Sequence, residues 1–353
     1  SQAKAVGIAL PPPMVGVAQM REDNGKVTNG FEVEQSIPFP IKLISEHSAR
    51  KYDAESEEEM HLAHKREILA GAKLLYFSLW CTQEKLNLLK YRKRILQDHI
   101  GLSKSTVRSD SFAATHLLKA ESDFDFLENE IEEMSQRQNE KQLEVAAFLN
   151  ADSSIFKIVA SEPPLSSIPE REATEASHQI QSLELRLESA RSKESEARSS
   201  WLPDFNLRYK QMGQTSMAGP YNEVMIGVTL PFVFFWEPNS QSKMAGAERT
   251  QKEYELQKER RNIDLKRESL YSRAASLQRQ IANLNGKLIP RAEKRMKAVH
   301  NLAPRDMETL QDHRETREAF PELQMKALEL RLLYEETVTE IEKYLPGKEM
   351  AHE

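Results

Sequence analysis

The residues with the best spacing for metal chemistry in this sequence are two histidines, His61 and His64, in the segment EEEMHLAH. Histidines three positions apart on a helix share a face and can bind one metal ion. Because both lie in a strongly charged segment, we interpret them as solvated residues and predict neither a metal site nor a cofactor. The sequence has no Gly-rich phosphate loop, no Ser-x-Gly elbow and no HExxH motif, so it does not predict an enzyme.

Sulfur-containing side chains are the other candidates for chemistry. Four methionines fall in or near predicted strands: Met20, Met212, Met217 and Met225. Their thioethers could contact a soft cation, although such side chains more often pack or face lipid. Cys81 is the one cysteine, which excludes an internal disulfide and a cysteine-based zinc site, and we interpret it as an apolar helix residue.

The composition indicates what kind of elements hold these residues. The 353 residues are 39% hydrophobic and 29% charged, which favours long helices with narrow apolar seams over a thick globular core. The net charge of −6, with both signs interleaved, argues against nucleic acid as a partner. No run of about 18 apolar residues occurs, which excludes an ordinary transmembrane helix but not a barrel of short alternating strands.

The second half of the sequence repeats the first. PPPMVGVAQM, from Pro11, aligns with PDFNLRYKQM, from Pro203, and IPF, from Ile37, aligns with LPF, from Leu230. The segments between these matches are rich in Gly and Asn, as turns require. Each repeat therefore predicts a β-hairpin, over 11–40 and over 203–235.

The hairpins alternate apolar and polar residues, as in FEVEQSI from Phe31 and DFNLRYK from Asp204. Successive side chains of a strand point to opposite faces, so each hairpin has one apolar face and one wet face. A soluble sheet with one solvated face would show the same pattern. Proline follows the strands at Pro38, Pro40 and Pro231, where a chain leaving a sheet must stop pairing and enter a helix.

Each hairpin is followed by a predicted helical hairpin, over 41–149 and over 239–345. Heptad spacing predicts coiled-coil seams, with turns at His99–Asp110 and His300–Leu310 and a left-handed helix cap at Gly101. A Ser- and Pro-rich connector (150–172) joins the first repeat, 1–149, to the second, 173–345. The second repeat opens with a helix (173–200), and a short tail (346–353) ends the chain. We expect that a comparable helix ahead of the first hairpin lies outside this chain.

This order of elements resembles the TolC-type family of outer-membrane efflux proteins, over essentially the whole chain. The resemblance is carried by LPPPMVGVAQM, VEQSIPFPIKL, SWLPDFNLRYKQM and MIGVTLPFVFFWEPNSQSKMAGA. The tip IGLSKST is similar to the family's Val-Gly-Leu-x-x-x-Thr pattern, whereas NLAPRD at the second tip has Ala303 where glycine is usual. The segment SIPFPIKL most resembles the heavy-metal efflux branch of the family.

The resemblance implies a mostly helical homotrimer with a membrane β portion. Four strands from each chain would close a twelve-stranded barrel in the outer membrane of a Gram-negative bacterium, continued by a helical tunnel in the periplasm. It implies a passive exit duct for substrates expelled by a proton-driven inner-membrane transporter through a periplasmic adaptor protein. Type I protein secretion through the same fold is the alternative function, and a soluble coiled-coil scaffold is a weaker one.

The resemblance also implies roles for individual residues. The periplasmic constriction would lie at Arg305, Asp306, Glu308 and Asp312. The adaptor would dock at the tip residues Gly101, Leu102, Ser103 and Thr106. The charged strand residues would face the lumen, because burial of Arg or Lys against hydrocarbon costs about 2 to 4 kcal/mol each near the bilayer centre; they are Glu32, Glu34, Arg208 and Lys210.

Overall fold

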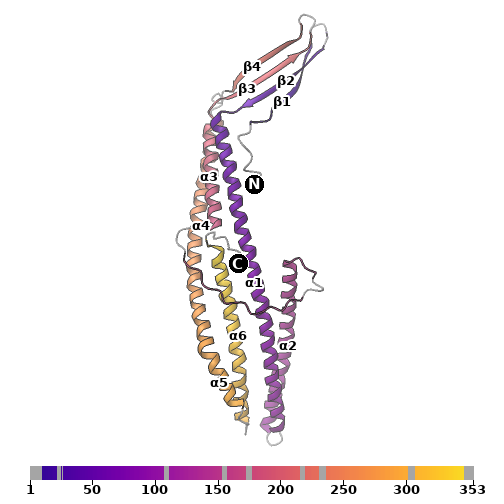
Figure 1. Cartoon of the computed structure of the whole chain (residues 1–353), viewed down its shortest axis with the longest axis vertical. Coiled ribbons are helices and arrows are strands. Elements are labelled where there is room, and N and C mark those ends of the chain that lie inside the picture. Colours follow the sequence, from indigo (N-terminus) through magenta and orange to yellow (C-terminus); the bar gives the residue numbers. More distant parts are fainter. Residues whose placement is uncertain are drawn as a thin grey trace. The chain divides into compact units, whose positions relative to one another are not determined.

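The structure is a computed structural model that describes residues 10–21, 25, 27–106, 111–152, 157–171, 177–214, 219–229, 236–300 and 307–345. Within these ranges the chain forms one four-stranded sheet and a set of long helices (Figure 1). The elements are β1 (Met14–Arg21), β2 (Val27–Ile37), α1 (Pro40–Thr106), α2 (Ser111–Phe148), α3 (His178–Ser199), β3 (Asp204–Met212), β4 (Tyr221–Thr229), α4 (Trp236–Asn283), the π-helical turn η4 (Leu284–Leu288), α5 (Ile289–His300) and α6 (Met307–Lys343).

The chain divides into two compact units. The first holds residues 1–63, 176–263 and 346–353, and the second holds 64–175 and 264–345. Each unit combines segments from both halves of the sequence, because corresponding parts of the two repeats pack together. The units therefore differ from the two repeats, and the division into repeats stays a prediction about the sequence.

The sheet of the first unit joins the two predicted hairpins into one surface. Its strand order is β1-β2-β3-β4, with every neighbouring pair antiparallel. The central pairing of β2 with β3 aligns Glu34 with Arg208, although the two residues lie far apart in the sequence. Among the described residues, no helix is long and apolar enough to cross a membrane.

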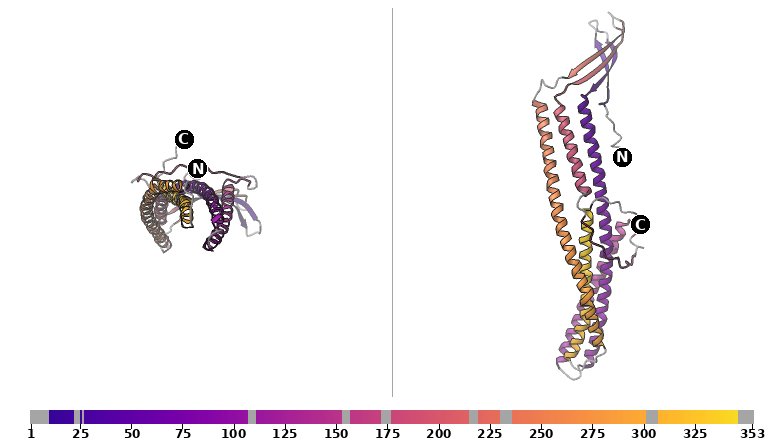
Figure 2. Two further views of the ribbon diagram at one scale, coloured as in Figure 1. Left: turned by 90° about the horizontal axis from the view of Figure 1, so that it is seen from below. Right: turned by 60° about the vertical axis from the view of Figure 1, so that its left-hand side comes forward.

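Three helices run side by side in the first unit, namely α3 and the N-terminal parts of α1 and α4 (Figure 2). Small polar side chains fill much of the contact between α1 and α3: the hydroxyl of Ser56 lies 3.0 Å from that of Ser182, and Ser45 lies 3.2 Å from Ser195. Small side chains let two helix backbones approach closely, which explains why a polar sequence forms this layer. Ser177 caps α3 by accepting a hydrogen bond from the backbone of Ile180.

Two of the apolar clusters in the second unit are helix seams, and both confirm the predicted heptad patterns. One seam joins α1 to α2 through buried residues, namely Leu89, Leu96, Ala120 and Leu127. The other joins α4 and η4 to α6, through Ala274, Leu277, Ile281, Leu284, Leu330, Tyr334, Val338 and Ile341. Full burial of a large aliphatic side chain contributes about 1.5 to 3 kcal/mol, so each buried leucine or isoleucine of these seams stabilises the unit.

The first helix of the predicted helical hairpin 239–345 is interrupted, and this corrects the sequence analysis. The turn Leu284–Leu288 is π-helical and ends two residues before Pro290. Proline has no backbone N–H for the carbonyl of Gly286, four residues earlier, and its ring crowds that carbonyl, so a wider turn relieves the conflict. A second proline, Pro321, lies inside α6 and is fully buried.

The connector between the halves is tied to the helices of the second unit by hydrogen bonds. Gln83 accepts from the backbone of Ala160 at 3.0 Å, and Tyr334 donates to the carbonyl of Ser166 at 2.7 Å. Glu335, fully buried, accepts from the backbone N–H of Ser166 at 3.0 Å. A segment without regular structure is thus anchored by polar side chains that the helices supply.

Candidate functional site

The sheet has two chemically different faces, as the alternating strand sequences predicted. Directly opposed residues share a face, so the register defines rows across all four strands. One row is Met14–Glu34–Arg208–Met225, and the next is Gly16–Glu32–Lys210–Glu223. We call this the charged face of the sheet. Arg208 donates to one oxygen of Glu34 through Nη2 at 2.8 Å and through Nε at 3.2 Å.

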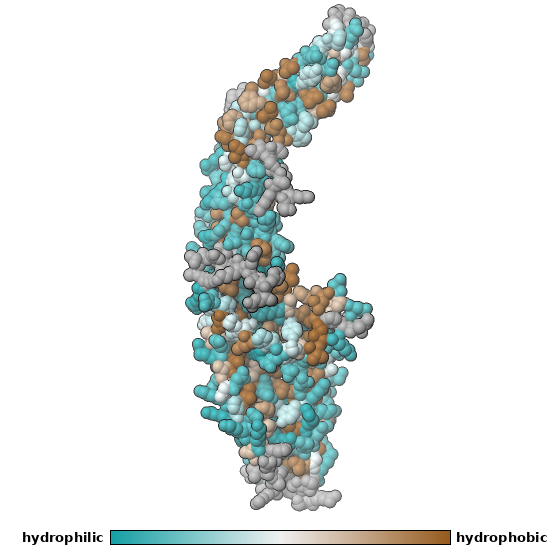
Figure 3. All heavy atoms as spheres, viewed as in Figure 1, coloured by the Kyte–Doolittle hydropathy of each residue, from teal (hydrophilic) through white to brown (hydrophobic). Residues whose placement is uncertain are grey.

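The opposite face of the sheet is apolar and uncovered in the single chain. Val17 and Ile226 are each 75% exposed, and Val15 is 70% exposed. In Figure 3 hydrophobic residues, in brown, are interspersed with hydrophilic ones over the strands. An exposed apolar surface of this kind marks a contact with a membrane or another protein.

The edges of the sheet are also open. In the described chain β1 pairs only with β2, and β4 pairs only with β3. Each edge strand therefore presents a row of backbone N–H and C=O groups without partners from the sheet. An open-edged sheet with one apolar face is suited to pair with further copies of itself inside a membrane, where every backbone group must be bonded.

The strand-to-helix joint lies where the prolines predicted the change of direction. Pro38 follows the end of β2, and Pro40 is the first residue of α1, a position where its missing N–H costs nothing. Pro231, the predicted counterpart, lies outside the described residues.

The joint is held by an ion pair that sequence analysis missed. Lys42 donates to Asp204 Oδ1 at 2.8 Å and to the carbonyl of Leu202 at 2.9 Å. The same Asp204 oxygen accepts the backbone N–H of Phe39 at 3.1 Å. The start of β3 thereby fixes the start of α1. The only sequence signal was the position of Asp204 directly after Pro203.

The predicted tip residues lie in the last turns of α1. The left-handed cap at Gly101 is wrong, because α1 continues to Thr106 and, within the described ranges, positive φ occurs only at Gly25 and Asn150. The physical reason is continued packing, since Ser103 is fully buried. Leu102 is 38% exposed, and the side chain of Thr106 is outside the described part of the structure.

Only some of the predicted constriction residues lie within the described residues. Arg305 and Asp306 lie outside the described residues, and Glu308 lies in α6 with its side chain outside them. Asp312 is exposed on the first turns of α6. The predicted turn His300–Leu310 is too long, because α6 already begins at Met307.

A buried polar cluster that sequence analysis missed lies close to these residues. Arg314 of α6 forms an ion pair with Asp123 of α2 at 2.7 Å. His99 of α1 is buried, and its Nδ1 has no hydrogen-bond partner. Burial lowers the pKa of His99 to about 4, helped by the positive charge of Arg314 and by the neighbouring His313 and His116, with Asp123 opposing. The three helices thus meet around an uncharged imidazole and a paired guanidinium.

The histidine pair of the sequence analysis lies on an exposed helix surface. His61 and His64 lie on the exposed surface of α1, where His64 Nδ1 is 3.1 Å from Glu67 of the same helix. Among the described residues, no group of three or more His, Cys, Asp or Glu side chains is arranged to hold a metal ion.

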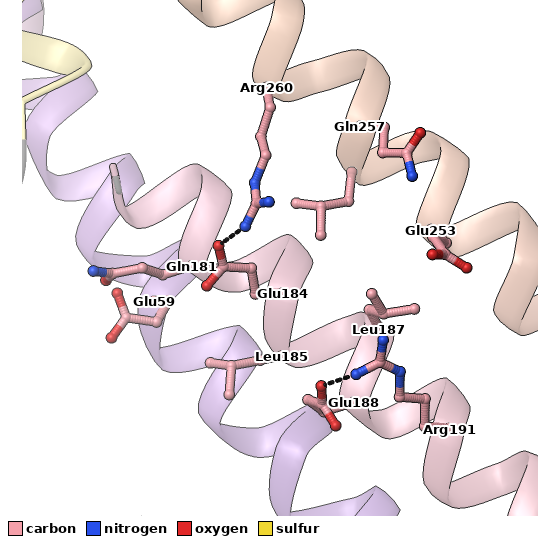
Figure 4. Close-up of a pocket in the computed structure, with 11 residues that line it drawn as sticks. Glu59, Gln181, Glu184, Leu185, Leu187, Glu188, Arg191, Glu253, Gln257 and Arg260 are labelled. Atoms are coloured by element: carbon pink, nitrogen blue, oxygen red, sulfur yellow. Dashed lines mark hydrogen bonds and ion pairs between the residues drawn. The ribbon is translucent and has the colours of Figure 1, made fainter. Parts of the chain in front are cut away.

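A hollow of about 660 Å³ lies beside α3 and α4 in the first unit (Figure 4). Arg260 forms an ion pair with Glu184, and Arg191 pairs with Glu188 at 2.6 Å. None of the described residues that line it is a histidine, cysteine, serine or threonine. The described lining therefore offers no hydroxyl, thiol or imidazole, and both of its arginines are paired with glutamates.

Known proteins with the same arrangement of a four-stranded sheet and long helices match this chain. A family model described as outer membrane efflux protein matches residues 171–346. A membrane protein from Pseudomonas aeruginosa superposes with a TM-score of 0.80 at 11% identity, covering 97% of this chain and 85% of that chain. CusC superposes with a TM-score of 0.78 at 12% identity, covering 95% of this chain and 83% of that chain. MtrE of Neisseria gonorrhoeae superposes with a TM-score of 0.76 at 12% identity, covering 95% of this chain and 80% of that chain. No curated protein matches the sequence. The predicted fold class, four strands joined to long helices in each chain, is confirmed.

Proposed function

Because the chain belongs to the outer membrane efflux protein family, we propose that three copies assemble into a passive exit duct for substrates expelled by an inner-membrane transporter. The chain acts in the outer membrane of a Gram-negative bacterium, with its helices in the periplasm. Members of this family are exit ducts of efflux pumps, and the printed descriptions of several matched structures name channels. A duct of this kind needs no catalytic group, because the transporter supplies the work.

The observation that carries the proposal is the two-faced sheet with two open edges. Three chains contribute four strands each, and pairing β4 of one copy with β1 of the next removes every edge. The apolar face then contacts lipid, and the charged face surrounds the lumen. A soluble coiled-coil scaffold would leave Val17 and Ile226 in water, so the sheet argues against that alternative.

We extend the proposal to the helical end of the duct. A periplasmic adaptor protein would dock at the end of α1, where Gly101 and Leu102 are exposed. Glu308 and Asp312 of the three copies would form a ring of carboxylates that narrows the duct and favours cations by simple attraction. Asp312→Ala should then raise the conductance of the closed duct and weaken its block by divalent cations.

Two measurements test the duct. Purified protein in a planar lipid bilayer should give conductance steps, and cross-linking should trap a trimer. For the cross-link, a Cys81→Ser background carries Val15→Cys on β1 and Val224→Cys on β4, treated with a short bis-maleimide. Each single-cysteine variant is the matched control, because it cannot extend a chain of cross-links beyond a pair.

Covalent trimers in the double variant, with no more than pairs in the controls, would support ring closure. Absence of both conductance and trimers would refute the proposed duct. For the tip, Gly101→Trp should abolish resistance in cells while the trimer stays intact. If the trimer is lost instead, Gly101 serves folding and not docking.

A further inference from the structure

Three helices of the second unit meet in a polar cluster close to the predicted tip. His99 lies on α1, within about two turns of the C-terminal end of that helix. His313 and Arg314 lie on α6, within about two turns of its N-terminal end, and both histidines are buried. Asp123 of α2 completes the cluster through its ion pair with Arg314 at 2.7 Å. We call these four residues the polar junction.

The polar junction differs from the apolar seam beside it. Buried apolar residues hold α1 and α2 together, whereas ion pairs link α6 to this helix pair near the tip. Arg314 pairs with Asp123 of α2, and Arg317 pairs with Asp98 of α1 at 2.9 Å. An ion pair close to the surface contributes less to stability than a buried aliphatic side chain. We therefore expect α6 to separate from α1 and α2 more readily than those two helices separate from each other.

The imidazole of His99 makes the polar junction sensitive to protons. Within the described part of the chain its Nδ1 has no hydrogen-bond partner, so no bond at this atom stabilises an imidazolium. The charged and titratable groups that act on it are His116 and Asp123 from α2 and His313 and Arg314 from α6. Asp123 is the carboxylate of this set, and it already pairs with Arg314. A proton on His99 therefore adds a second buried positive charge for which the set has no further carboxylate.

We propose that the polar junction makes the duct responsive to acid: a proton on His99 separates α6 from α1 and α2 near the tip and shifts the duct towards its open form. The inference rests on the proposed duct, because the separation has a consequence for transport only where the helices enclose a path. Separation gives the imidazolium access to water, so the open form binds the proton more tightly than the closed form. By linkage, protons then favour the open form.

The size of the acid response has an upper bound. Burial holds the pKa of His99 at about 4 in the packed junction, against 6.5 for an ordinary imidazole. If opening exposes the imidazole fully, acidification from about pH 7.5 to about pH 5 shifts the equilibrium between closed and open forms by about thirtyfold for each copy. Partial exposure gives a smaller shift, and we expect about three- to thirtyfold.

The test is the conductance of the trimer in a planar lipid bilayer at about pH 7.5 and about pH 5. The native protein should spend a larger fraction of time open at the lower pH. His99→Leu and His99→Gln, which cannot take up the proton, should lack this rise, and melting curves at neutral pH show whether each variant is folded. His64→Leu is the matched control, because the side chain of His64 is 64% exposed. Carboxylates elsewhere in the duct also titrate in acid, but the native protein and the variants share them, so the difference isolates His99.

A cross-link tests where the helices separate. In a Cys81→Ser background, Asp98→Cys on α1 and Arg317→Cys on α6 replace an ion pair that joins these two helices. A short bis-maleimide then connects the two cysteines. The cross-linked trimer should lose the acid response, whereas the same protein before treatment should keep it. The Cys81→Ser protein treated with the reagent is the control and should respond as the native protein does.

Three results would overturn the inference: no acid response in the native protein, an unchanged response in both His99 variants, or a response that survives the cross-link. A response lost in His313→Leu and kept in His99→Leu would also overturn it, because another group would then take up the proton. Conductance at neutral pH separates these failures from that of the duct. If the trimer conducts without an acid response, only the role of the polar junction is wrong. If the protein neither forms trimers nor conducts, the proposed function is wrong as well.

Discussion

Acidification should loosen the contact of α1 with α2 and α6 around His99. The pKa of this buried imidazole lies at about 4, below its ordinary 6.5, because burial and the charge of Arg314 disfavour the protonated form. The unfolded chain binds a proton below about pH 6.5, whereas the folded chain resists it. Stability from this residue is therefore complete above about pH 6.5 and is lost as the pH falls towards 4.

The size of the effect follows from the same values. A pKa change from 6.5 to about 4 is equivalent to about 3 kcal/mol, at about 1.4 kcal/mol for each pH unit. This is an upper bound, since water and neighbouring side chains can adjust on protonation, and we expect about 1 to 3 kcal/mol. A loss of that size should speed hydrogen exchange of the backbone amides of α1 near residues 95–103.

The assay compares exchange rates and thermal unfolding at about pH 7.5 and about pH 4.5 in the native protein and in His99→Leu. The variant has no group to titrate, and its neutral stability should be close to native, because His99 Nδ1 makes no hydrogen bond. His64→Leu is the control, since the side chain of His64 is 64% exposed. Equal acid sensitivity of His99→Leu and the native protein would refute the argument.

Three further perturbations follow from single contacts. Gly30→Ala would drive a Cβ into the backbone of β3, so we expect the free energy of unfolding to fall by more than about 2 kcal/mol and a gel to show little folded trimer. The control is Gly71→Ala on an exposed helix surface, which should be neutral or stabilising by about 0.5 to 1 kcal/mol. Asp204→Asn should lower thermal stability by about 1 to 2 kcal/mol, because it weakens charge-assisted bonds with Lys42, and a melting temperature equal to native would contradict this. Burial would raise the pKa of Glu340, but hydrogen bonds from two lysines hold it at about 2. The stability that the ionised carboxylate contributes should be complete above about pH 4.5 and be lost as the pH falls towards 2. An acid titration of the stability of Glu340→Gln should lack this loss.

Local patterns in the sequence predicted the elements well. Alternation over FEVEQSI and DFNLRYK placed the charged and apolar residues on opposite faces, and the register confirms that division. Heptad spacing predicted coiled-coil seams between the helices, because a helix surface repeats with nearly the same period. Both patterns depend only on the geometry of one strand or one helix.

What could not be predicted depends on contacts between distant segments. The pairing of β2 with β3 brings together residues from the two halves of the chain, and neither hairpin sequence specifies its neighbour. The end of α1 was misplaced because a glycine permits a cap without requiring one, and packing of Ser103 extends the helix past Gly101. The π turn before Pro290 was overlooked, although the proline itself was visible in the sequence.

The strand-to-helix joint combines both kinds of information. Pro38 and Pro40 determine where the chain stops pairing, and they do so locally, through a missing N–H and a restricted φ. They do not determine the direction that α1 takes. That direction is set by Lys42 and by the backbone of Phe39, which both bind one carboxylate oxygen of Asp204 from the other half of the sequence. A change at Asp204 should therefore alter how the helix leaves the sheet even when both prolines are kept, which is why the joint requires both repeats.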